Sequence, residues 1–350
     1  MSFPIQTPIT VTGATGYVAG HVVQQLLERG ATVHATVRDP DNEKKVGHLK
    51  KMGEELPGTL KLFKADLLVD GDFAEAIAGN EVVIHTASPF LVGKIKDPQK
   101  SLIDPALKGT RNVLNTVNAT DTVKRVVLTS SVVAIFGDTT ECAAKGGVLT
   151  EEHWNETSSI DHAPYNYSKR LAEEEAWKMC KAQDRWNMAT INPGFVMGPS
   201  LTSRNDSASI DFLLSLINGK FAAGMMEFYT AWVDVRDVAF AHVEAAIRED
   251  AEGRHILSCK ETGVMEVVAG LKEDVELKLK LPKRQVPKFM GYIFGPLMGF
   301  SWKHVSRNIG IPLKMDNTRS IERLGVQYKP LRVTMKEHVE QLIKDGLYTP

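Results

Sequence analysis

The chain has 350 residues, of which 43% are hydrophobic, so it can bury a sizeable core, which argues against disorder. Its 42 basic and 43 acidic side chains nearly cancel, which leaves no overall field to hold a polyanion, and we expect no nucleic acid partner. The start, MSFPIQTPITV, has neither a basic region nor a long apolar run, so we expect no secretory signal, no anchor and a cytoplasmic location. Three cysteines lie far apart without metal-ligand spacing, which predicts reduced thiols and no metal site.

Short β-branched runs alternate with helical patterns from the N-terminus to Pro193. Helices are expected up to Arg29, up to Met52, over Phe73–Ala78 and over about Tyr165–Lys181. The runs expected to form strands are ITVTG, TVHATVR, LKLFKAD, EVVIHTA, RVVLTSS and NMATINP. Six strands joined by crossover helices indicate one parallel sheet, so the predicted fold class is α/β, a doubly wound sheet of the Rossmann type.

The regular alternation ends after Pro193, where glycines, prolines and the Phe- and Met-rich segment GKFAAGMMEFYTAW follow. Helices are expected over Val235–Arg248 and, in two patterns, over about 316–347. The apolar stretch Phe289–Phe300 is shorter than the ~20 residues of a membrane-spanning helix and rich in glycine, which favours a buried or substrate-facing loop. The predicted division is a dinucleotide-binding domain of residues 1–193 plus about 231–258, and a smaller substrate-binding lobe of about 194–230 and 259–350.

A glycine-rich turn follows the first predicted strand. ITVTGATGYVAGH places Gly13 and Gly16 directly after the strand and begins a helix at Tyr17, where free backbone N–H groups and the helix dipole favour a pyrophosphate. Ala19 stands where the dinucleotide fingerprint often has a third glycine, and the fingerprint tolerates alanine there. The alternative is a tight turn without a nucleotide, but its position in a βαβ unit favours a dinucleotide-binding loop.

The end of the second strand, TVRDP, indicates which dinucleotide binds. An acidic residue there contacts the ribose 2′-hydroxyl, whereas an arginine accepts a 2′-phosphate. Arg38 comes first and Asp39 second, and Lys44 and Lys45 add positive charge nearby. We therefore expect NADPH/NADP rather than NADH/NAD; the alternative is that these cations form a solvated rim.

Tyr165 and Lys169 stand four residues apart at the start of a predicted helix, so they project from the same face. An ammonium beside a phenol stabilises the phenolate that remains after the tyrosine gives its proton to a carbonyl. Ser130 and Ser131 end the strand RVVLTSS, at the edge where ligands bind in doubly wound sheets. Neither serine lies in a GxSxG context, so a hydrolase nucleophile is not expected.

Taken together, TGATGYVAG, TVRDP, KADL, VVIHTASPF, VVLTSS, YNYSK, INPGFVMGP and WVDVRDVAFAH resemble an extended short-chain dehydrogenase/reductase over nearly the whole chain. The chain looks most similar to the group of dihydroflavonol 4-reductases, cinnamoyl-CoA reductases and yeast-type methylglyoxal or ketone reductases. The resemblance implies an NADPH-dependent carbonyl reductase that acts on a small-molecule aldehyde or ketone as a monomer or homodimer, without a membrane partner.

The resemblance also implies a role for individual residues. Ser131 matches the serine that binds the carbonyl, with Ser130 in reserve, Tyr165 matches the general acid, and Lys169 also contacts the nicotinamide ribose. The implied cofactor contacts are Thr12, Gly13, Thr15, Gly16, Tyr17 and Val18 in the glycine loop, Arg38 and Lys45 at the 2′-phosphate, Asp66 and Leu67 at the adenine, Thr86, Ala87 and Ser88 along the ribose and nicotinamide, Pro193 at the nicotinamide, and Val196.

Other polar and aromatic residues have simpler interpretations. Asp234 is expected to cap a helix, and Glu173, Glu174 and Glu175 are expected on a solvated face. Four histidines, His21, His34, His48 and His85, lack metal-site spacing and are expected to be structural. Residues that form either an apolar substrate pocket or plain core are Phe90, Phe195, Met225, Met226, Phe228, Tyr229 and Trp232.

Three other functions share these motifs. A nucleotide-sugar epimerase or dehydratase has the same fold and tyrosine–lysine pair, but typically an acidic residue at the second strand end, where this chain has Arg38. A non-catalytic nucleotide sensor commonly loses the tyrosine or the lysine, and this chain keeps both. A steroid dehydrogenase/isomerase differs only in the substrate lobe, so the sequence leaves that alternative open.

Overall fold

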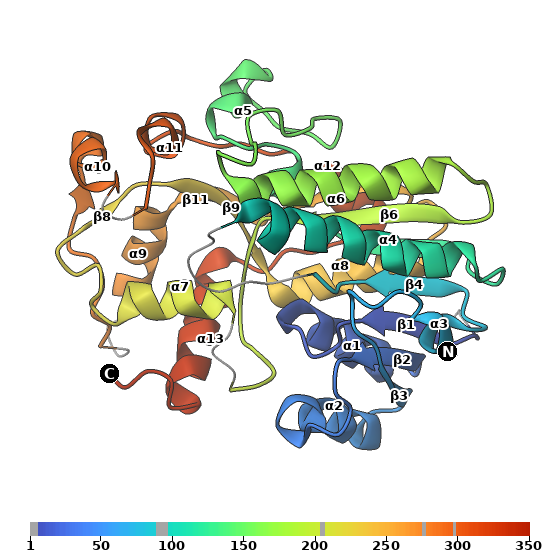
Figure 1. Ribbon diagram of the computed structural model, residues 1–350. Coiled ribbons are helices and arrows are strands. Elements are labelled where there is room, and N and C mark those ends of the chain that lie inside the picture. The colour runs from blue at the N-terminus through green and yellow to red at the C-terminus, as the bar shows by residue number, and fades with distance from the viewer. Residues whose placement is uncertain (1–5, 89–96, 204–206, 275–277, 297–298) are drawn as a thin grey trace.

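A computed structural model describes residues 6–88, 97–203, 207–274, 278–296 and 299–350 (Figure 1). Within these residues, seven parallel strands form the central sheet in the order β10-β6-β5-β4-β1-β2-β3. The order reverses between β1 and β4, which is the point where doubly wound sheets bind their ligands. The strands are β1 (Ile9–Thr12), β2 (Thr32–Val37), β3 (Thr59–Lys64), β4 (Val82–His85), β5 (Arg125–Thr129), β6 (Asn187–Pro193) and β10 (Gly253–Leu257).

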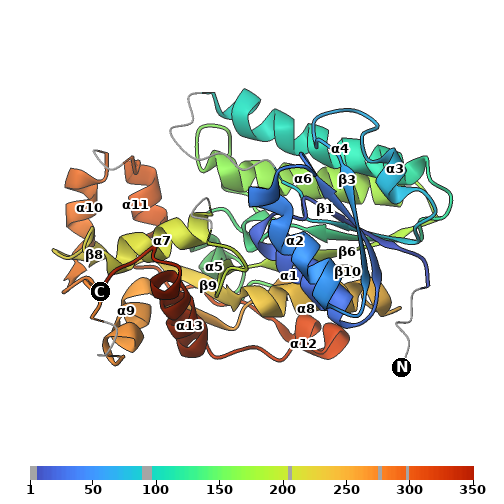
Figure 2. The same cartoon turned by 90° about the horizontal axis from the view of Figure 1, so that it is seen from below.

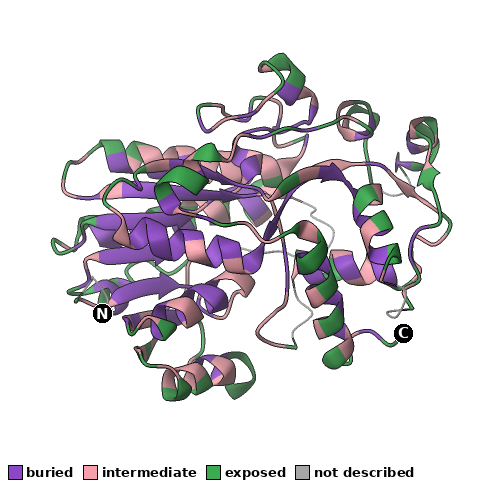
Figure 3. Ribbon diagram, turned by 180° about the vertical axis from the view of Figure 1, so that it is seen from behind, coloured by how far each residue is buried: buried purple, intermediate pink, exposed green. Residues whose placement is uncertain are grey.

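Helices cover both faces of this sheet, which gives three layers (Figure 2). One face carries α1 (Tyr17–Glu28), α2 (Glu43–Glu55) and α8 (Val235–Ile247), and the other carries α3 (Ala74–Ile77), α4 (Asp104–Asn118) and α6 (Pro164–Lys181). The central strands are therefore buried on both sides, which explains why ITVT and VVIH are continuous β-branched runs rather than alternating ones. Figure 3 shows the sheet as the most buried part of the molecule.

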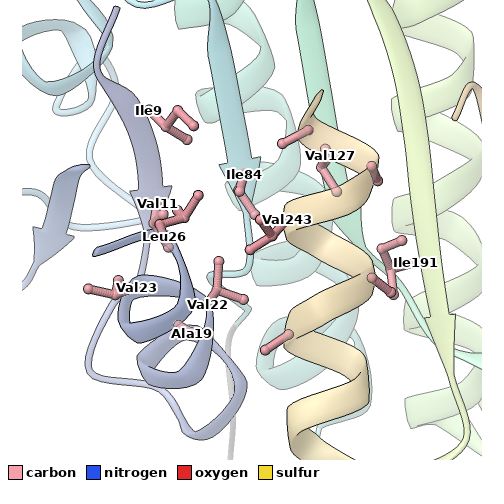
Figure 4. Packing of buried hydrophobic residues seen from close by; sticks show 14 of the residues in the cluster. Ile9, Val11, Ala19, Val22, Val23, Leu26, Ile84, Val127, Ile191 and Val243 are labelled. Carbon is pink, nitrogen blue, oxygen red and sulfur yellow. The ribbon is translucent and has the colours of Figure 1, made fainter. Parts of the chain in front are cut away.

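The main core lies between the sheet and the pair α1 and α8. Val22 and Leu26 of α1 are fully buried, and Leu26 lies beside Val11 of β1 (Figure 4). Val243 of α8 belongs to the same cluster and lies beside Ile84 of β4. Burial of each such side chain contributes about 1.5–3 kcal/mol, so this cluster holds the carboxyl ends of the strands in place for the site.

The rest of the chain is built around smaller sheets. The strands β7 (Phe195–Met197), β9 (Tyr229–Asp234) and β11 (Lys260–Gly263) form one, and β8 (Met225–Met226) pairs with β12 (Gln285–Val286). A second apolar core around the fully buried Trp232 joins β7, β8 and β9 to the helices α7 (Ala208–Ile217), α9 (Val264–Lys272) and α13 (Leu331–Lys344). The other helices are α10 (Lys288–Phe294), α11 (Trp302–Asn308), η1 (Gln99–Ile103), η2 (Val132–Ala134), α5 (Thr140–Ala144) and α12 (Thr318–Leu324).

The predicted α/β fold and all six predicted strands are confirmed, and the described residues add a seventh strand, β10. The expected loop over Phe289–Phe300 is wrong in part, because Lys288–Phe294 forms α10 and Phe289 is 61% exposed. Gly291 does not break this helix. It allows close packing instead, since a Cβ there would lie 2.7 Å from the Met226 sulfur. No helix among the described residues is long and apolar enough to cross a membrane.

Candidate active site

A cleft of about 1510 Å³ opens at the carboxyl ends of the central strands. Its walls come from the start of α1, the end of β5, the start of α6 and the turn after β6 on one side, and from β8, β9, α7, α10 and α11 on the other. Most of the predicted site residues lie here: Thr15, Gly16, Tyr17, Val18, Ser130, Ser131, Tyr165, Lys169, Pro193 and Val196 line it.

The glycine turn is shaped by close backbone approach. Gly13 has a φ of +66°, in the left-handed region, and a Cβ there would lie 3.0 Å from the Cα of Ala87. Gly16 has extended backbone as the N-cap of α1 and, having no side chain, does not itself cap the N–H groups of that helix. The N–H groups at the start of α1 therefore face the cleft, and the helix dipole favours an anion there.

Thr12 lies beneath the turn and not on the cleft wall. Its fully buried hydroxyl accepts hydrogen bonds from the N–H groups of Thr86 and Ala87 at 3.1 and 3.0 Å and is hydrogen-bonded to His85. It joins the end of β1 to the end of β4, so it orients the segment predicted to run along the ribose. Burial, and to a smaller extent the charge of Lys169, lowers the pKa of His85 to about 3, which keeps this histidine neutral and structural.

The predicted catalytic residues come together in the cleft. Tyr165 is the second residue of α6 and is 44% exposed, and Lys169, one turn later, donates a hydrogen bond to the Ser88 hydroxyl at 3.2 Å. Ser131 follows β5, where its hydroxyl accepts from the Val133 N–H at 3.3 Å. Ala163, just before α6, has a φ of 53°, a strained conformation of the kind that gathers at functional sites.

The two serines differ in what their hydroxyls contact. The Ser130 hydroxyl donates a hydrogen bond to the buried carboxylate of Glu173. The Ser131 hydroxyl is half-buried and, among the described residues, donates only in a long 3.5 Å contact with the Pro193 carbonyl. Ser131 is thus the serine with a hydroxyl available to a ligand, which favours it over Ser130.

Glu173 is the residue that sequence reasoning missed. It was expected on a solvated face, but its side chain is fully buried and its carboxylate forms an ion pair with Arg254 of β10 at 2.6 Å. The available signal was its spacing, because Glu173 lies on the same face of α6 as Tyr165 and Lys169. Glu174 and Glu175 meet the expectation, since both form surface ion pairs.

The residues predicted for the adenosine end lie outside the cleft lining but at the same edge of the sheet. Arg38 follows β2 and Lys45 begins α2, and both are exposed without an ion pair to another described residue. Asp66 and Leu67 follow β3, where the Asp66 carboxylate accepts from the Leu68 N–H at 2.8 Å. This edge therefore offers cations to solvent beside the glycine turn.

Asp234 caps α8, as expected, and accepts a hydrogen bond from the Arg236 N–H at 2.8 Å. Burial acts to raise its pKa, but hydrogen bonds from Arg236 and Thr334 bring the pKa below its usual value. His21, His34 and His48 show no metal-site geometry, and no group of three His, Cys, Asp or Glu among the described residues can hold a metal ion.

The apolar candidates separate into two sets. Phe195, Met225, Met226, Phe228 and Tyr229 line the cleft, whereas Trp232 is core. Phe90 lies outside the described residues. The half of the cleft opposite the glycine turn is therefore largely apolar, with Phe294, Phe300 and Ile309 completing it.

Comparison with known proteins shows the family of the chain. Residues 9–258 match the NAD dependent epimerase/dehydratase family. A cinnamoyl-CoA reductase from Medicago truncatula is 40% identical over 338 residues, which cover 95% of each chain. An anthocyanidin reductase from Arabidopsis thaliana is 37% identical over 269 residues, covering 73% of this chain and 77% of the relative.

Solved structures give the same picture. A crystal structure of Gre2 from Candida albicans in complex with NADPH has a TM-score of 0.76 and 28% identity, covering 98% of this chain and 99% of that one. The yeast methylglyoxal/isovaleraldehyde reductase, also complexed with NADPH, has a TM-score of 0.78 and 25% identity, covering 97% and 100%.

Proposed function

Because the chain belongs to the NAD dependent epimerase/dehydratase family and is a reductase of the extended short-chain dehydrogenase/reductase type, we propose that it reduces an aldehyde or ketone to an alcohol with NADPH. The observation that carries the proposal is the meeting of Ser131, Tyr165 and Lys169 on one wall of a cleft whose other end is a glycine turn. The relatives' names and the NADPH complexes of two structural neighbours support it.

The residues present fit the dinucleotide. The bare start of α1 suits the pyrophosphate, because a side chain at Gly13 would collide with Ala87 and Gly16 offers only backbone. Arg38 and Lys45 suit the 2′-phosphate as exposed cations that form no ion pair with another residue in the part of the chain that the structure describes. Lys169 suits the nicotinamide ribose, and when bound, the reduced nicotinamide supplies a hydride.

We assign the proton chemistry to three side chains. Ser131 holds the carbonyl oxygen by a hydrogen bond, and the Tyr165 hydroxyl gives its proton to that oxygen as the carbonyl carbon accepts the hydride. The C=O double bond becomes a C–O single bond, and the proton leaves a phenolate on Tyr165. The Lys169 ammonium stabilises that phenolate until solvent restores the proton.

We further propose that about 194–230 and 259–350 form the substrate-binding lobe, with residues 1–193 and about 231–258 binding the dinucleotide. The apolar wall built from β8, β9 and α10 supports a substrate with an apolar body attached to its carbonyl.

The test is oxidation of NADPH, followed at the absorbance of the reduced nicotinamide, against aldehydes, aryl ketones, β-keto esters, a dihydroflavonol and a ketosteroid, with NADH in parallel. Tyr165→Phe should bind NADPH as the wild type does but lose about 10²–10⁴ in kcat, the range of general acid catalysis. Silence with every carbonyl together with turnover of a nucleotide sugar would move the protein to the epimerases.

A further inference from the structure

A buried carboxylate lies behind the catalytic wall of the cleft. Glu173 is 1% exposed and accepts hydrogen bonds from three elements besides its own. One oxygen, Oε2, accepts from the Ser130 hydroxyl at the end of β5 and from the Asn192 amide of β6 at 2.8 Å. The other, Oε1, accepts from the Arg254 guanidinium of β10 at 2.6 Å.

The Asn192 amide connects the Glu173 carboxylate to Ser131 on the catalytic wall of the cleft. The same Nδ2 that donates to Glu173 also donates to the main-chain oxygen of Ser131 at 3.2 Å. Asn192 is followed directly by Pro193, which lines the cleft beside Ser131. Through Asn192, the Glu173 carboxylate therefore holds both the backbone of Ser131 and the strand end that carries Pro193.

Glu173 lies on the helix that carries the other two catalytic groups. It follows Tyr165 and Lys169 at successive intervals of four residues, so all three share one face of α6. Tyr165 and Lys169 point to the cleft, while Glu173 is buried one turn further on against β5, β6 and β10. Any rotation or slide of α6 relative to these strands would have to break its hydrogen bonds.

We propose that Glu173 is a positioning residue that fixes the catalytic face of α6 against the strand ends carrying Ser131 and Pro193. The proposal rests on the reductase function proposed above. Proton and hydride transfer need reacting atoms about 3–3.5 Å apart, and a displacement of about 1 Å costs on the order of 100-fold in rate. A carboxylate with several fixed donors is suited to hold such a register, because each lost bond leaves a buried donor unsatisfied.

The alternative is that Glu173 only stabilises the fold as the partner of Arg254, whose side chain is 7% exposed and also donates to the Glu151 carbonyl at 2.7 Å. Two double variants separate these roles. Both replace the buried ion pair, which is often tolerated when apolar groups of similar volume take its place. In Glu173→Gln/Arg254→Met the amide oxygen still accepts from Ser130 and Asn192, and in Glu173→Met/Arg254→Met no acceptor remains.

Positioning predicts that the variant with glutamine keeps kcat within about threefold of the wild type and that the variant with methionine loses at least tenfold. The Kd for NADPH should stay within about threefold in both, because the network does not touch the glycine turn. With NADPH deuterated at the transferred position, the isotope effect on kcat should rise only in the methionine variant, a change that lower stability alone does not produce.

Equal kcat values in two folded double variants would overturn the proposal, provided that the wild type reduces the test carbonyl. A wild type without carbonyl reduction would instead reject the proposed function itself. If the methionine variant does not fold, Asn192→Ala decides the matter, since it cuts the link to Ser131 while leaving the ion pair intact. It should lower kcat at least fivefold without changing the Kd for NADPH, and an unchanged kcat would again overturn the proposal.

Discussion

Arg38 is the residue on which the choice of dinucleotide depends. It stands exposed at the end of β2, with no ion pair to another residue that the structure describes, so its charge is available to a 2′-phosphate. A hydrogen bond to a charged group contributes about 1.5–3 kcal/mol. Arg38→Ala should therefore raise the KM for NADPH by about 10–100-fold and leave the KM for NADH nearly unchanged.

The matched control is Lys51→Ala, which removes an exposed cation from α2 that already pairs with Glu55. It should change neither KM by more than about twofold. Steady-state kinetics with both cofactors provide the measurement. An equal rise for NADPH and NADH in Arg38→Ala would mean that Arg38 contacts a group common to both cofactors.

Asp237, near the start of α8, makes the stability of the protein depend on pH. Burial, helped by the charge of Asp234, raises the pKa of Asp237 to about 6, above the ~3.9 of an unfolded aspartate. Folding therefore favours the protonated form, and this stabilisation is complete below about pH 4 and is lost as the pH rises through 6.

Asp237→Asn removes this titration and keeps an oxygen for the Lys329 N–H, which donates to Asp237 at 2.8 Å. The free energy of unfolding of the variant minus that of the wild type should increase by about 2 kcal/mol from pH 4 to pH 8. Urea denaturation at several pH values measures it. A difference that stays constant over this range would contradict the raised pKa.

Single residues were predictable where their geometry is local. Tyr165 and Lys169 share a helix, and the four-residue spacing alone puts them on one face. Glu173 was not, because its partners Ser130, Asn192 and Arg254 lie at or just after three different strands, 19 to 81 residues away on either side of it. A run of three glutamates predicts a solvent-exposed helix face. The burial of Glu173 becomes evident only once β10, which carries its partner Arg254, is placed in the sheet.

At the level of elements, the N-cap of α8 is a buried junction. Asp234 is fully buried and accepts from the Arg236 N–H and the Thr334 hydroxyl, both at 2.8 Å, so it joins α8 to α13. Asp234→Ala should lower the free energy of unfolding by about 2–3 kcal/mol, since it removes a cap and leaves buried donors without a partner.

A cap in an exposed place is the comparison. Ser301 caps α11, where its exposed hydroxyl accepts from the His304 N–H at 3.1 Å. Ser301→Ala should cost no more than about 1 kcal/mol, because water replaces the lost bond. Chemical denaturation of both variants checks the ranking, and equal losses would show that burial adds nothing to the cap of α8.

The helices and strands differed in how well the sequence predicted them. β6 was predicted with its observed bounds, because NMATINP lies between turn residues and is buried throughout most of its length. β10 was missed because GRHIL holds Arg254 and His255, which are unusual in a buried strand and become possible only through partners elsewhere in the fold. α10 was taken for a loop because the glycines that allow it to pack against Met226 look like helix breakers.

At the scale of the whole molecule, the cleft has one wall from the parallel sheet and one from the later part of the chain. The first wall was predictable, since the carboxyl ends of parallel strands meet at one edge and each motif except the tyrosine–lysine pair followed a predicted strand. The second wall combines β8, β9, α7, α10 and α11, which have no periodic order along the chain. The meeting of β8, β9 and α7 depends on long-range packing around Trp232, which a local pattern does not encode.

This division predicts that the two walls can be altered separately. Phe294 and Phe289 both lie on α10, but Phe294 lines the cleft at 47% exposure, whereas Phe289 is 61% exposed and outside the lining. Loss of half the burial of a phenylalanine corresponds to about 1 kcal/mol. Phe294→Ser should therefore raise the KM for a carbonyl substrate with an apolar body about fivefold and leave the Kd for NADPH unchanged.

Phe289→Ser is the matched control on the same helix and should change neither constant, because its side chain does not reach the cleft. Steady-state kinetics at saturating NADPH and a fluorescence titration of the cofactor measure the two quantities. Since both substitutions lie on α10 and at exposed positions, a general loss of stability would affect them alike. If Phe294→Ser weakened cofactor binding as much as substrate binding, the second wall would belong to the dinucleotide site as well, and the separation of the two walls would be wrong.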